Sequence, residues 1–357
     1  MDKAFSELST GQKVLRPMLV LLLLLAVYLC LRLFVLAPSP NAVAYTDANA
    51  GVMGLHIPRN LNFCGEKIPA NDFEIKRDLE REFFSNAYWK SNSLLLFRKA
   101  QRWFPYIEPI LKAEGIPDDF KYVAVIESHL SNVRSSAGAA GFWQLVPGTA
   151  ASLGLEVNEF VDERYDVEKS TKAACQLLKQ AYKVFHSWTL TAAAYNRGIN
   201  GILRAVKEQK SNDYHQLILN PETGSFVYRV LAYKTLFSSP GHFGIKKRKW
   251  NYFPPIQYKT FKIDSAVHSI TALATHIKTT EAAILQHNAW ILRKELPHNP
   301  SKIYTVKVPK KNAEYTGYID DLHPGKLFQL ATDTVKKSTA IDSASIKPIT
   351  SENKYAN

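Results

Sequence analysis

The sequence contains few of the residues from which metal centres and redox sites are built. Only three of its 357 residues are cysteines. They form neither a CxxC pair nor the spacing of a zinc site, so no metal and no cofactor are expected. Cys175 lies on an apolar stripe and is interpreted as a small core residue. A disulfide between Cys64 and Cys175 is the alternative if the chain works in an oxidising compartment.

Nucleic-acid-binding motifs are also missing, although the chain is strongly basic. Its 45 Lys and Arg residues exceed its 32 Asp and Glu residues, which gives a formal net charge of +13. Such a charge suits nucleic acid, an anionic membrane or an acidic polymer. The basic residues are scattered, apart from a cluster at 246–249. We therefore expect no nucleic-acid partner, and the charge either matches an acidic polymer or only aids solubility.

Strand patterns are scarce between residues 71 and 237, where the apolar spacing is that of amphipathic helices. The fold class predicted for this part is mainly α. Asp118 or Asp119 is expected to cap the helix that carries Glu127. The other well-defined helices are expected at residues 72–86, 93–114, 166–185, 188–196 and 226–237. Asp166 is expected to cap the helix that ends near Phe185.

An apolar run at residues 18–37 is the most hydrophobic part of the chain. Lys13 and Arg16 precede it, so its positive end is expected inside the cell. The run approaches the ~20 residues that span a bilayer, which predicts a membrane anchor. Residues 42–44 (AVA) resemble a signal-peptidase site, so cleavage is the alternative. Both interpretations export the rest of the chain.

Glu127 interrupts an otherwise apolar helix face. Phe120, Val123, Ala124 and Glu127 are spaced i, i+3, i+4 and i+7, so they lie on one face. An ionised carboxylate is costly to bury there and tends to keep its proton. A carboxylic acid that is still protonated near neutral pH can serve as a general acid. Glu127 is thus the candidate catalytic residue, and the alternative is a helix-end Glu that only reaches into water.

Two further motifs accompany this acid. Residues 135–144 read SSAGAAGFWQ, and residues 194–198 read AYNRG. With Glu127–Ser128 and ETGSFV at 222–227, they resemble the lytic transglycosylase family, the soluble-lytic-transglycosylase domain of glycoside hydrolase family 23. The membrane-bound D branch of that family is the most similar. The resemblance covers roughly residues 100–237.

The match departs from the family pattern at two aromatic positions. Phe142 replaces the usual Leu or Met, and Phe226 stands where the family usually has a Tyr. The stretch between Glu127 and Ser135 is also one residue shorter than the commonest form.

The resemblance implies a lysozyme-like domain that cleaves the β-1,4 bond between N-acetylmuramic acid and N-acetylglucosamine without water. Glu127 would act as the acid and then as the base, leaving a 1,6-anhydro end. Only one carboxylate is needed, unlike in most glycosidases. The nearest candidates for a second one in the sequence are Asp162, Glu163 and Asp166. The substrate-binding residues that the resemblance implies are Ser135, Gly141, Phe142, Gln144, Tyr195 and Asn196.

The pattern changes after residue 255. Alternating residues predict strands at 258–263 and 304–308, with two short helices between 266 and 292 and Asn288 ending the second. This β-α-α-β order resembles a degenerate LysM module, which would bind glycan; a small packing domain is the alternative. The expected boundaries are 1–37 for the anchor or signal segment, 38–70 for a linker, 71–250 for the lysozyme-like domain, 255–310 for the LysM-like module and 311–357 for a polar, partly disordered tail.

The leading hypothesis is a peptidoglycan lytic transglycosylase of the cell envelope. It would bind glycan strands, with its N-terminal segment in the membrane and its catalytic domain in the periplasm. One alternative is a catalytically weak or inactive peptidoglycan-binding protein with the same anchor. The other is a hydrolytic muramidase, which would need a second carboxylate to position water.

Overall fold

The computed structural model describes residues 57–58, 60–87, 90–243 and 253–310. The predicted anchor and the predicted C-terminal tail lie outside these residues. In the part of the chain that the structure describes, no helix is both long and apolar enough to cross a bilayer. All the described residues fall within one compact unit, Leu55–Asn357.

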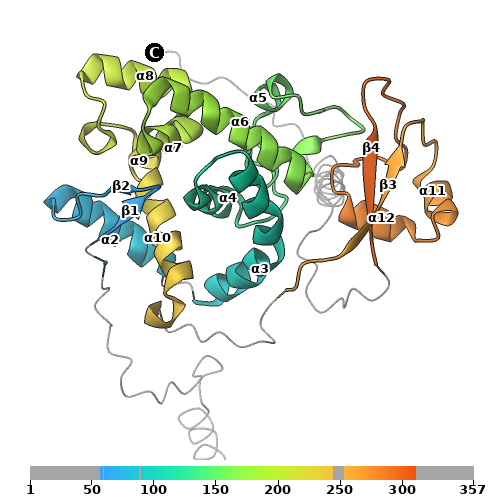
Figure 1. The fold of residues 1–357 in the computed structure, drawn as a ribbon, viewed down its shortest axis with the longest axis horizontal. Coiled ribbons are helices and arrows are strands. Elements are labelled where there is room, and N and C mark those ends of the chain that lie inside the picture. Colours follow the sequence, from blue (N-terminus) through green and yellow to red (C-terminus); the bar gives the residue numbers. More distant parts are fainter. Residues whose placement is uncertain (1–56, 59, 88–89, 244–252, 311–357) are drawn as a thin grey trace, which may run out of the picture. The chain divides into compact units, whose positions relative to one another are not determined.

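Most of the described residues are helical, so the predicted fold class, mainly α, is confirmed (Figure 1). Among the described residues before 240, the α-helices are α2 (Phe73–Ala87), α3 (Lys90–Ala113), α4 (Lys121–Ser128), α5 (Pro147–Ser152), α6 (Val167–Phe185), α7 (Trp188–Arg197), α8 (Ile199–Gln209), α9 (Pro221–Gly224) and α10 (Phe226–Ser238). Short 3-10 turns lie at Asp118–Phe120, Glu163–Tyr165, Tyr214–Gln216 and Pro240–Phe243.

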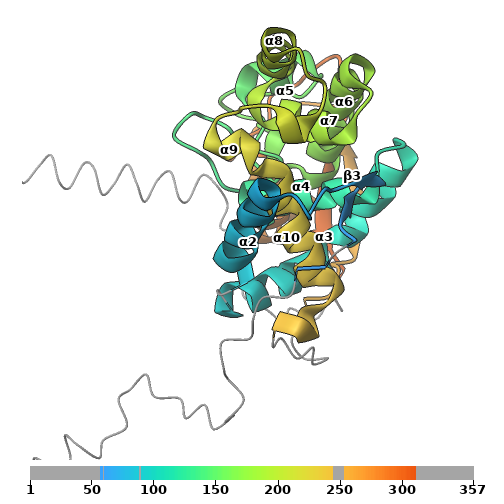
Figure 2. The ribbon, with the colours of Figure 1, turned by 90° about the vertical axis from the view of Figure 1, so that its left-hand side faces the viewer.

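Helix α10 lies in the core of this helical body. It contacts α2, α4 and α7, and Figure 2 shows it running beside α2. Its apolar side chains are buried around most of its circumference, as expected of a helix that is packed on several sides. Phe226, at its start, is 1% exposed. Because α4 packs against α10, Glu127 on α4 lies within electrostatic reach of Arg229 on α10.

The expected linker at 38–70 ends earlier than predicted. Strands β1 (Asn62–Phe63) and β2 (Glu66–Lys67) pair in an antiparallel hairpin. Phe63 is fully buried and packs edge-on against Phe120, with the ring centroids 5.2 Å apart. The apolar side chains of this short segment therefore belong to the core, and the prediction of a linker is wrong for it.

The predicted helix caps have different outcomes. Asp166 caps α6 by accepting from the backbone N–H groups of Glu168 and Lys169, as predicted. No side chain caps α4, because the 3-10 turn leads directly into it. Asp119 instead accepts hydrogen bonds from the Cys64 backbone N–H and the Lys234 Nζ, both at 2.7 Å.

The two described cysteines are separate. Cys175 is fully buried on α6, which confirms it as a core residue. Cys64 and Cys175 are both free, so the alternative of a disulfide between them is not realised.

The C-terminal module has the predicted β-α-α-β order. Its elements are β3 (Tyr258–Ile263), α11 (Ile270–His276), α12 (Glu281–His287) and β4 (Tyr304–Pro309). The strands are antiparallel, with Tyr258 opposite Pro309. Asn288 ends α12 as predicted and is fully buried. Its side chain bonds to both the N–H and the C=O of Lys307, which joins α12 to β4.

Candidate active site

Glu127 lies in the last turn of the short helix α4. Val123 and Ala124, both one turn earlier on the same face, are fully buried, whereas Glu127 is half-buried. The helix ends because His129 adopts a left-handed conformation with φ of 50°. Its neighbour Ser128 donates to the carbonyls of Ala124 and Phe142, which ties the helix end to the next motif. Ser128 thus anchors the backbone next to Glu127 both to its own helix and to the segment around Phe142.

The environment of Glu127 keeps its carboxyl group protonated up to neutral pH. Burial, followed by the negative charge of Glu222, raises its pKa to about 7. The positive charge of Arg229 opposes this rise. Arg229 also donates to Glu82 at 3.2 Å, so part of its charge is balanced within α2. The acid that the helix-face pattern predicted is therefore present, and burial is its main cause.

Residues 133–145 form a compact loop, called here the active-site loop, which contains four of the predicted site residues. The backbone N–H of Gly141 donates to the carbonyl of Val133 at 3.0 Å. The Ser135 hydroxyl accepts from the backbone N–H of Ala139 at 3.1 Å, so it closes a turn within the loop. Gln144 has a left-handed φ of 46°. The structure therefore gives Ser135 and Gly141 clear parts in shaping this loop.

The carboxamide of Gln144 has a fixed orientation. Its Nε2 donates to the carbonyl of Val133 at 3.0 Å and to that of Gly141 at 2.8 Å. Both N–H bonds are thus used within the active-site loop. Its carbonyl oxygen has no donor among the described residues and can accept from an outside group.

The two aromatic residues of this loop are buried in the core. Phe142 is fully buried and packs edge-on against Trp103, with the ring centroids 5.1 Å apart. Trp143 is also fully buried, and its Nε1 donates to the Thr171 hydroxyl at 2.9 Å. The Phe142 ring, which the family resemblance placed among the substrate-binding residues, is enclosed by protein in this structure.

Helix α7 brings Tyr195 to the same place. The Tyr195 hydroxyl donates to the carbonyl of Trp143 at 2.6 Å, which fixes the phenol beside the active-site loop. Burial, followed by the negative charge of Glu127, raises the pKa of Tyr195 well above its usual value. The phenol is therefore neutral at physiological pH and lies within electrostatic reach of the catalytic candidate.

Asn196 joins α7 to a second carboxylate. Its Nδ2 donates to Glu222 Oε1 at 3.2 Å, and its Oδ1 accepts from the Thr223 hydroxyl at 2.8 Å. Glu222 is exposed on α9 and acts on the pKa of Glu127. Six predicted residues are therefore on two elements, the active-site loop and α7, that meet at the Tyr195–Trp143 bond.

The three acids that the sequence offered as candidates for a second carboxylate have structural roles. Asp162 pairs with Arg164 at 2.7 Å, and Glu163 pairs with Lys169 at 2.5 Å. Asp166 caps α6. All three are structural, and Glu222 is the carboxylate near Glu127. The available signal was its position at the start of the ETGSFV motif, directly after an Asn-Pro pair that begins a helix.

We expect Glu222→Gln to move the pH dependence of activity towards acid. Removing this negative charge lowers the pKa of Glu127, so the acid form is lost at lower pH and the descending limb of the rate profile shifts down. Initial rates measured between pH 5 and pH 9 would test this. Glu208→Gln, the same change at an exposed position of α8, is the control. A descending limb that stays in place would contradict the coupling.

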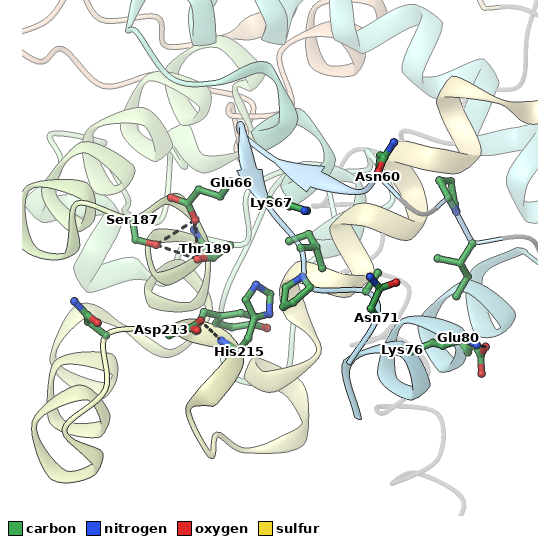
Figure 3. Close-up of a pocket in the computed structure, with 17 residues that line it drawn as sticks. Asn60, Glu66, Lys67, Asn71, Lys76, Glu80, Ser187, Thr189, Asp213 and His215 are labelled. Atoms are coloured by element: carbon green, nitrogen blue, oxygen red, sulfur yellow. Dashed lines mark hydrogen bonds and ion pairs between the residues drawn. The ribbon is translucent and has the colours of Figure 1, made fainter. Parts of the chain in front are cut away.

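A polar pocket of about 1130 Å³ lies beside the start of α7, and no predicted site residue lines it (Figure 3). Glu66 on its wall accepts from the backbone N–H groups of Trp188 and Thr189 and from the hydroxyls of Ser187 and Thr189. A carboxylate at a helix N-terminus is favoured by the helix dipole and by its unpaired N–H groups. The hairpin thus fixes α7, the helix that carries Tyr195 and Asn196.

Comparison with known proteins agrees with this geometry. Residues 105–218 match the family model described as Transglycosylase SLT domain. The chain is 30% identical over 185 residues to the membrane-bound lytic murein transglycosylase D of Escherichia coli K12, covering 50% of this chain and 40% of that protein. It matches the same protein of E. coli O6:H1 equally. It is also 29% identical over 160 residues to a putative tributyltin chloride resistance protein of Alteromonas sp. M-1, covering 44% of this chain and 74% of that one.

The chain thus matches about two fifths of the length of the E. coli relatives. The matched segment contains Glu127, the active-site loop and the Tyr195–Asn196 pair. The resemblance to lytic transglycosylases that the motifs indicated is confirmed.

Proposed function

We propose that this chain, which contains a transglycosylase SLT domain at residues 105–218, is a peptidoglycan lytic transglycosylase that leaves 1,6-anhydromuramoyl ends. The observation that carries the proposal is the half-buried Glu127, whose pKa is raised to about 7 mainly by burial. A general acid works best when its pKa is close to the operating pH. Glu127 is then protonated often enough to start the reaction and ionised readily enough to finish it.

One carboxyl group is sufficient for both steps. Glu127 donates its proton to the glycosidic oxygen as the bond from that oxygen to C1 of the muramoyl sugar breaks. The resulting carboxylate takes the proton of the muramoyl C6 hydroxyl as the C6 oxygen bonds to C1. Glu127 ends protonated as it began, and no water is consumed. The family resemblance supports this sequence of steps over attack by water.

Three neighbouring groups support substrate positioning. The oxygen of the Gln144 carboxamide faces away from its two internal acceptors, so it suits an N–H or O–H group of an N-acetyl sugar. Tyr195 remains a neutral phenol beside Glu127. Asn196 holds Glu222 and thereby keeps a negative charge near the acid, where it helps to stabilise positive charge developing at C1.

A hydrolytic muramidase is the second candidate, because Glu222 gives it a specific residue. In an inverting glycosidase a second carboxylate activates water on the far side of the sugar. Glu222 is exposed, as such a base would be. The hydrogen bond from Asn196 uses one of its carboxylate oxygens, which favours a purely electrostatic part for Glu222 instead.

Mass spectrometry of digested peptidoglycan distinguishes the proposals. Purified glycan strands would be incubated with the protein, and the new ends of the released fragments would be identified. We expect 1,6-anhydromuramoyl ends. Reducing muramoyl ends would establish the hydrolytic reaction, and the absence of new ends would establish the binding protein without catalysis.

We further propose that the chain is membrane-anchored and that its catalytic domain is in the periplasm. The apolar run at 18–37, preceded by Lys13 and Arg16, supports this, and the E. coli relative is described as membrane-bound. Cell fractionation with protease added to the periplasmic side should find the full-length protein in the membrane and residues after 45 accessible. A full-length protein in the soluble cytoplasmic fraction would contradict this topology.

A further inference from the structure

Arg164, a buried residue outside the active-site loop, binds the loop backbone at two carbonyl groups. Its guanidinium is 2% exposed and donates through Nη1 to the carbonyls of Gly138 and Leu145, at 2.7 and 2.9 Å. Asp162 binds the other side of the guanidinium through two bonds, Nε to Oδ1 at 2.9 Å and Nη2 to Oδ2 at 2.7 Å. Such a two-point Arg–carboxylate pair fixes the guanidinium in one orientation.

The same residue also meets the centre of the loop. Gly141 has a left-handed φ of 77°, and a Cβ atom there would lie 2.0 Å from the backbone carbonyl oxygen of Arg164. Arg164 therefore contacts the loop at Gly138, Gly141 and Leu145, on both sides of the turn that orients Gln144. The position of the Gln144 carboxamide depends on where this Arg is held.

The C-terminal module holds the segment that contains Arg164. The backbone N–H of Asp162 donates to the carbonyl of Trp290 at 2.9 Å, and that of Leu292 donates to the carbonyl of Phe160 at 2.8 Å. Between these bonds, Val161 pairs with Ile291 as an isolated β-bridge. This segment thus extends the backbone hydrogen bonding of the module.

Side chains strengthen the same junction. Lys302 in the module donates to Glu163 at 2.8 Å, beside the bond from Lys169 to the same carboxylate. Although burial raises the pKa of Glu163, these bonds hold it below its usual value, so the carboxylate stays ionised. Tyr304 donates to Glu156 at 3.0 Å. Glu163, the residue directly before Arg164, and Glu156 are therefore both held by the module.

One apolar cluster joins the module to the active-site loop. Ala140 of the loop, Val161 and Tyr165 share a buried core with module residues that include Ile291 and Val306. Ala140 is 1% exposed and Val161 is fully buried. Neither side can bury these side chains alone, so the loop and the module are expected to keep each other ordered.

We propose that the C-terminal module is a positioning element of the active site, and that Arg164 is the positioning residue through which it acts on the loop. The module holds the segment at 156–166, Arg164 holds the active-site loop, and the loop orients Gln144. The inference deepens the proposed function and rests on it. It assigns the module a catalytic purpose that does not require glycan binding by the module itself.

The test compares two Lys→Met variants of the full-length protein. Lys302→Met removes the bonds from the module to Glu163 and Glu156. Lys294→Met is the matched control, because Lys294 is 77% exposed and pairs only within the module, with Glu281 at 2.7 Å. Arg164→Lys is a third variant that keeps the charge but loses the two-sided bonding of the guanidinium.

Three quantities would be measured on each protein: hydrogen–deuterium exchange of the active-site loop, kcat and KM on soluble glycan strands, and thermal stability. For Lys302→Met we expect faster exchange at the loop amides of Ser135, Ala140 and Gly141, which are hydrogen-bonded within the loop. We expect kcat to fall by about 10-fold for Lys302→Met and by up to ~100-fold for Arg164→Lys, with KM changing little, because misplacement of a positioning group slows the reaction step. Lys294→Met should match the wild type.

The outcomes separate the inference from the proposed function. A folded Lys302→Met protein whose loop exchange and kcat equal those of Lys294→Met would overturn the inference, even if Arg164→Lys fails to fold. A wild-type protein that releases no fragments would overturn the proposed function. The exchange measurement needs no activity, so it would still decide whether the module orders the loop. Loss of loop protection together with an unchanged kcat would also refute the positioning claim.

Discussion

Glu127→Gln is expected to reduce peptidoglycan cleavage by at least ~100-fold, the lower range for loss of a general acid–base residue. The amide has nearly the same shape as the protonated carboxyl group but can neither donate the acid proton nor take it back. Turbidity loss of a peptidoglycan suspension and release of soluble fragments would measure the change. Glu208→Gln, on the exposed face of α8, is the matched control and should retain full activity. A Glu127→Gln protein with wild-type rates would refute the assignment.

The difference in stability between the wild type and the same variant should depend on pH, which checks that burial raises the pKa of Glu127. Since folding raises the pKa of Glu127 from 4.5 to about 7, the folded state binds the proton more tightly than the unfolded state. Wild-type stability must therefore fall as pH rises from 4.5 through 7, while the neutral Gln is unaffected. The melting temperature of Glu127→Gln should be close to that of the wild type near pH 4 and higher than that of the wild type at pH 8. Equal melting differences at both pH values would show that burial does not perturb the carboxyl group.

Gly141→Ala is expected to abolish most activity and to destabilise the protein. The added Cβ would lie 2.0 Å from the Arg164 carbonyl oxygen, and the backbone there has a φ of 77° that L-residues rarely adopt. The overlap forces a backbone shift, and overpacking of this kind costs about 1–3 kcal/mol in addition to the strain of about 1–2 kcal/mol for a left-handed residue. Urea unfolding and turbidity assays would measure the two effects.

Two other glycines separate these contributions. Gly138 has a φ of 82° with open space around it, so Gly138→Ala should show the backbone strain alone. Gly148 has neither the positive φ nor a close neighbour, so Gly148→Ala should be neutral or slightly stabilising. If Gly141→Ala were no worse than Gly138→Ala, the contact between the active-site loop and Arg164 would be looser than described.

Local sequence signals predicted much of the helical framework. Asp166 was identified as a cap because an N-cap and the helix it begins are adjacent in sequence, and α6 begins after it. Asn288 ends α12 for the same local reason. The burial of the Glu127 face was also predictable, because apolar residues at i−4 and i−3 report directly on the helix face. These features depend on a few neighbouring residues.

Long-range contacts account for what the sequence did not predict. Glu66 lies more than 120 residues from the helix N-terminus that it caps, and its segment has the composition of a linker. Arg229 and Glu222 act on Glu127 only because α10 packs against α4 and α9 packs against α10. The buried ring of Phe142 could not be distinguished from a sugar-binding ring by its position in a motif. The spacing of residues within one helix or strand does not indicate which distant segments will pack together.

The junction between Arg164 and the C-terminal module is the clearest case of this kind. The sequence suggested two separate domains, with the module either binding glycan or packing. The structure gives them a shared core through Ala140 and Ile291 and a backbone link from Asp162 to Trp290. A pairing between segments about 130 residues apart leaves no trace in either segment alone.

Digestion of purified peptidoglycan in water enriched in oxygen-18 tests the central claim most directly. That claim is that Glu127 alone serves as acid and base and that the muramoyl C6 hydroxyl, not water, attacks C1. The account predicts fragments with 1,6-anhydromuramoyl ends, each lighter by one water than the reducing product and free of oxygen-18. Fragments with reducing muramoyl ends that carry one oxygen-18 atom at C1 would contradict it, because water would then be the nucleophile.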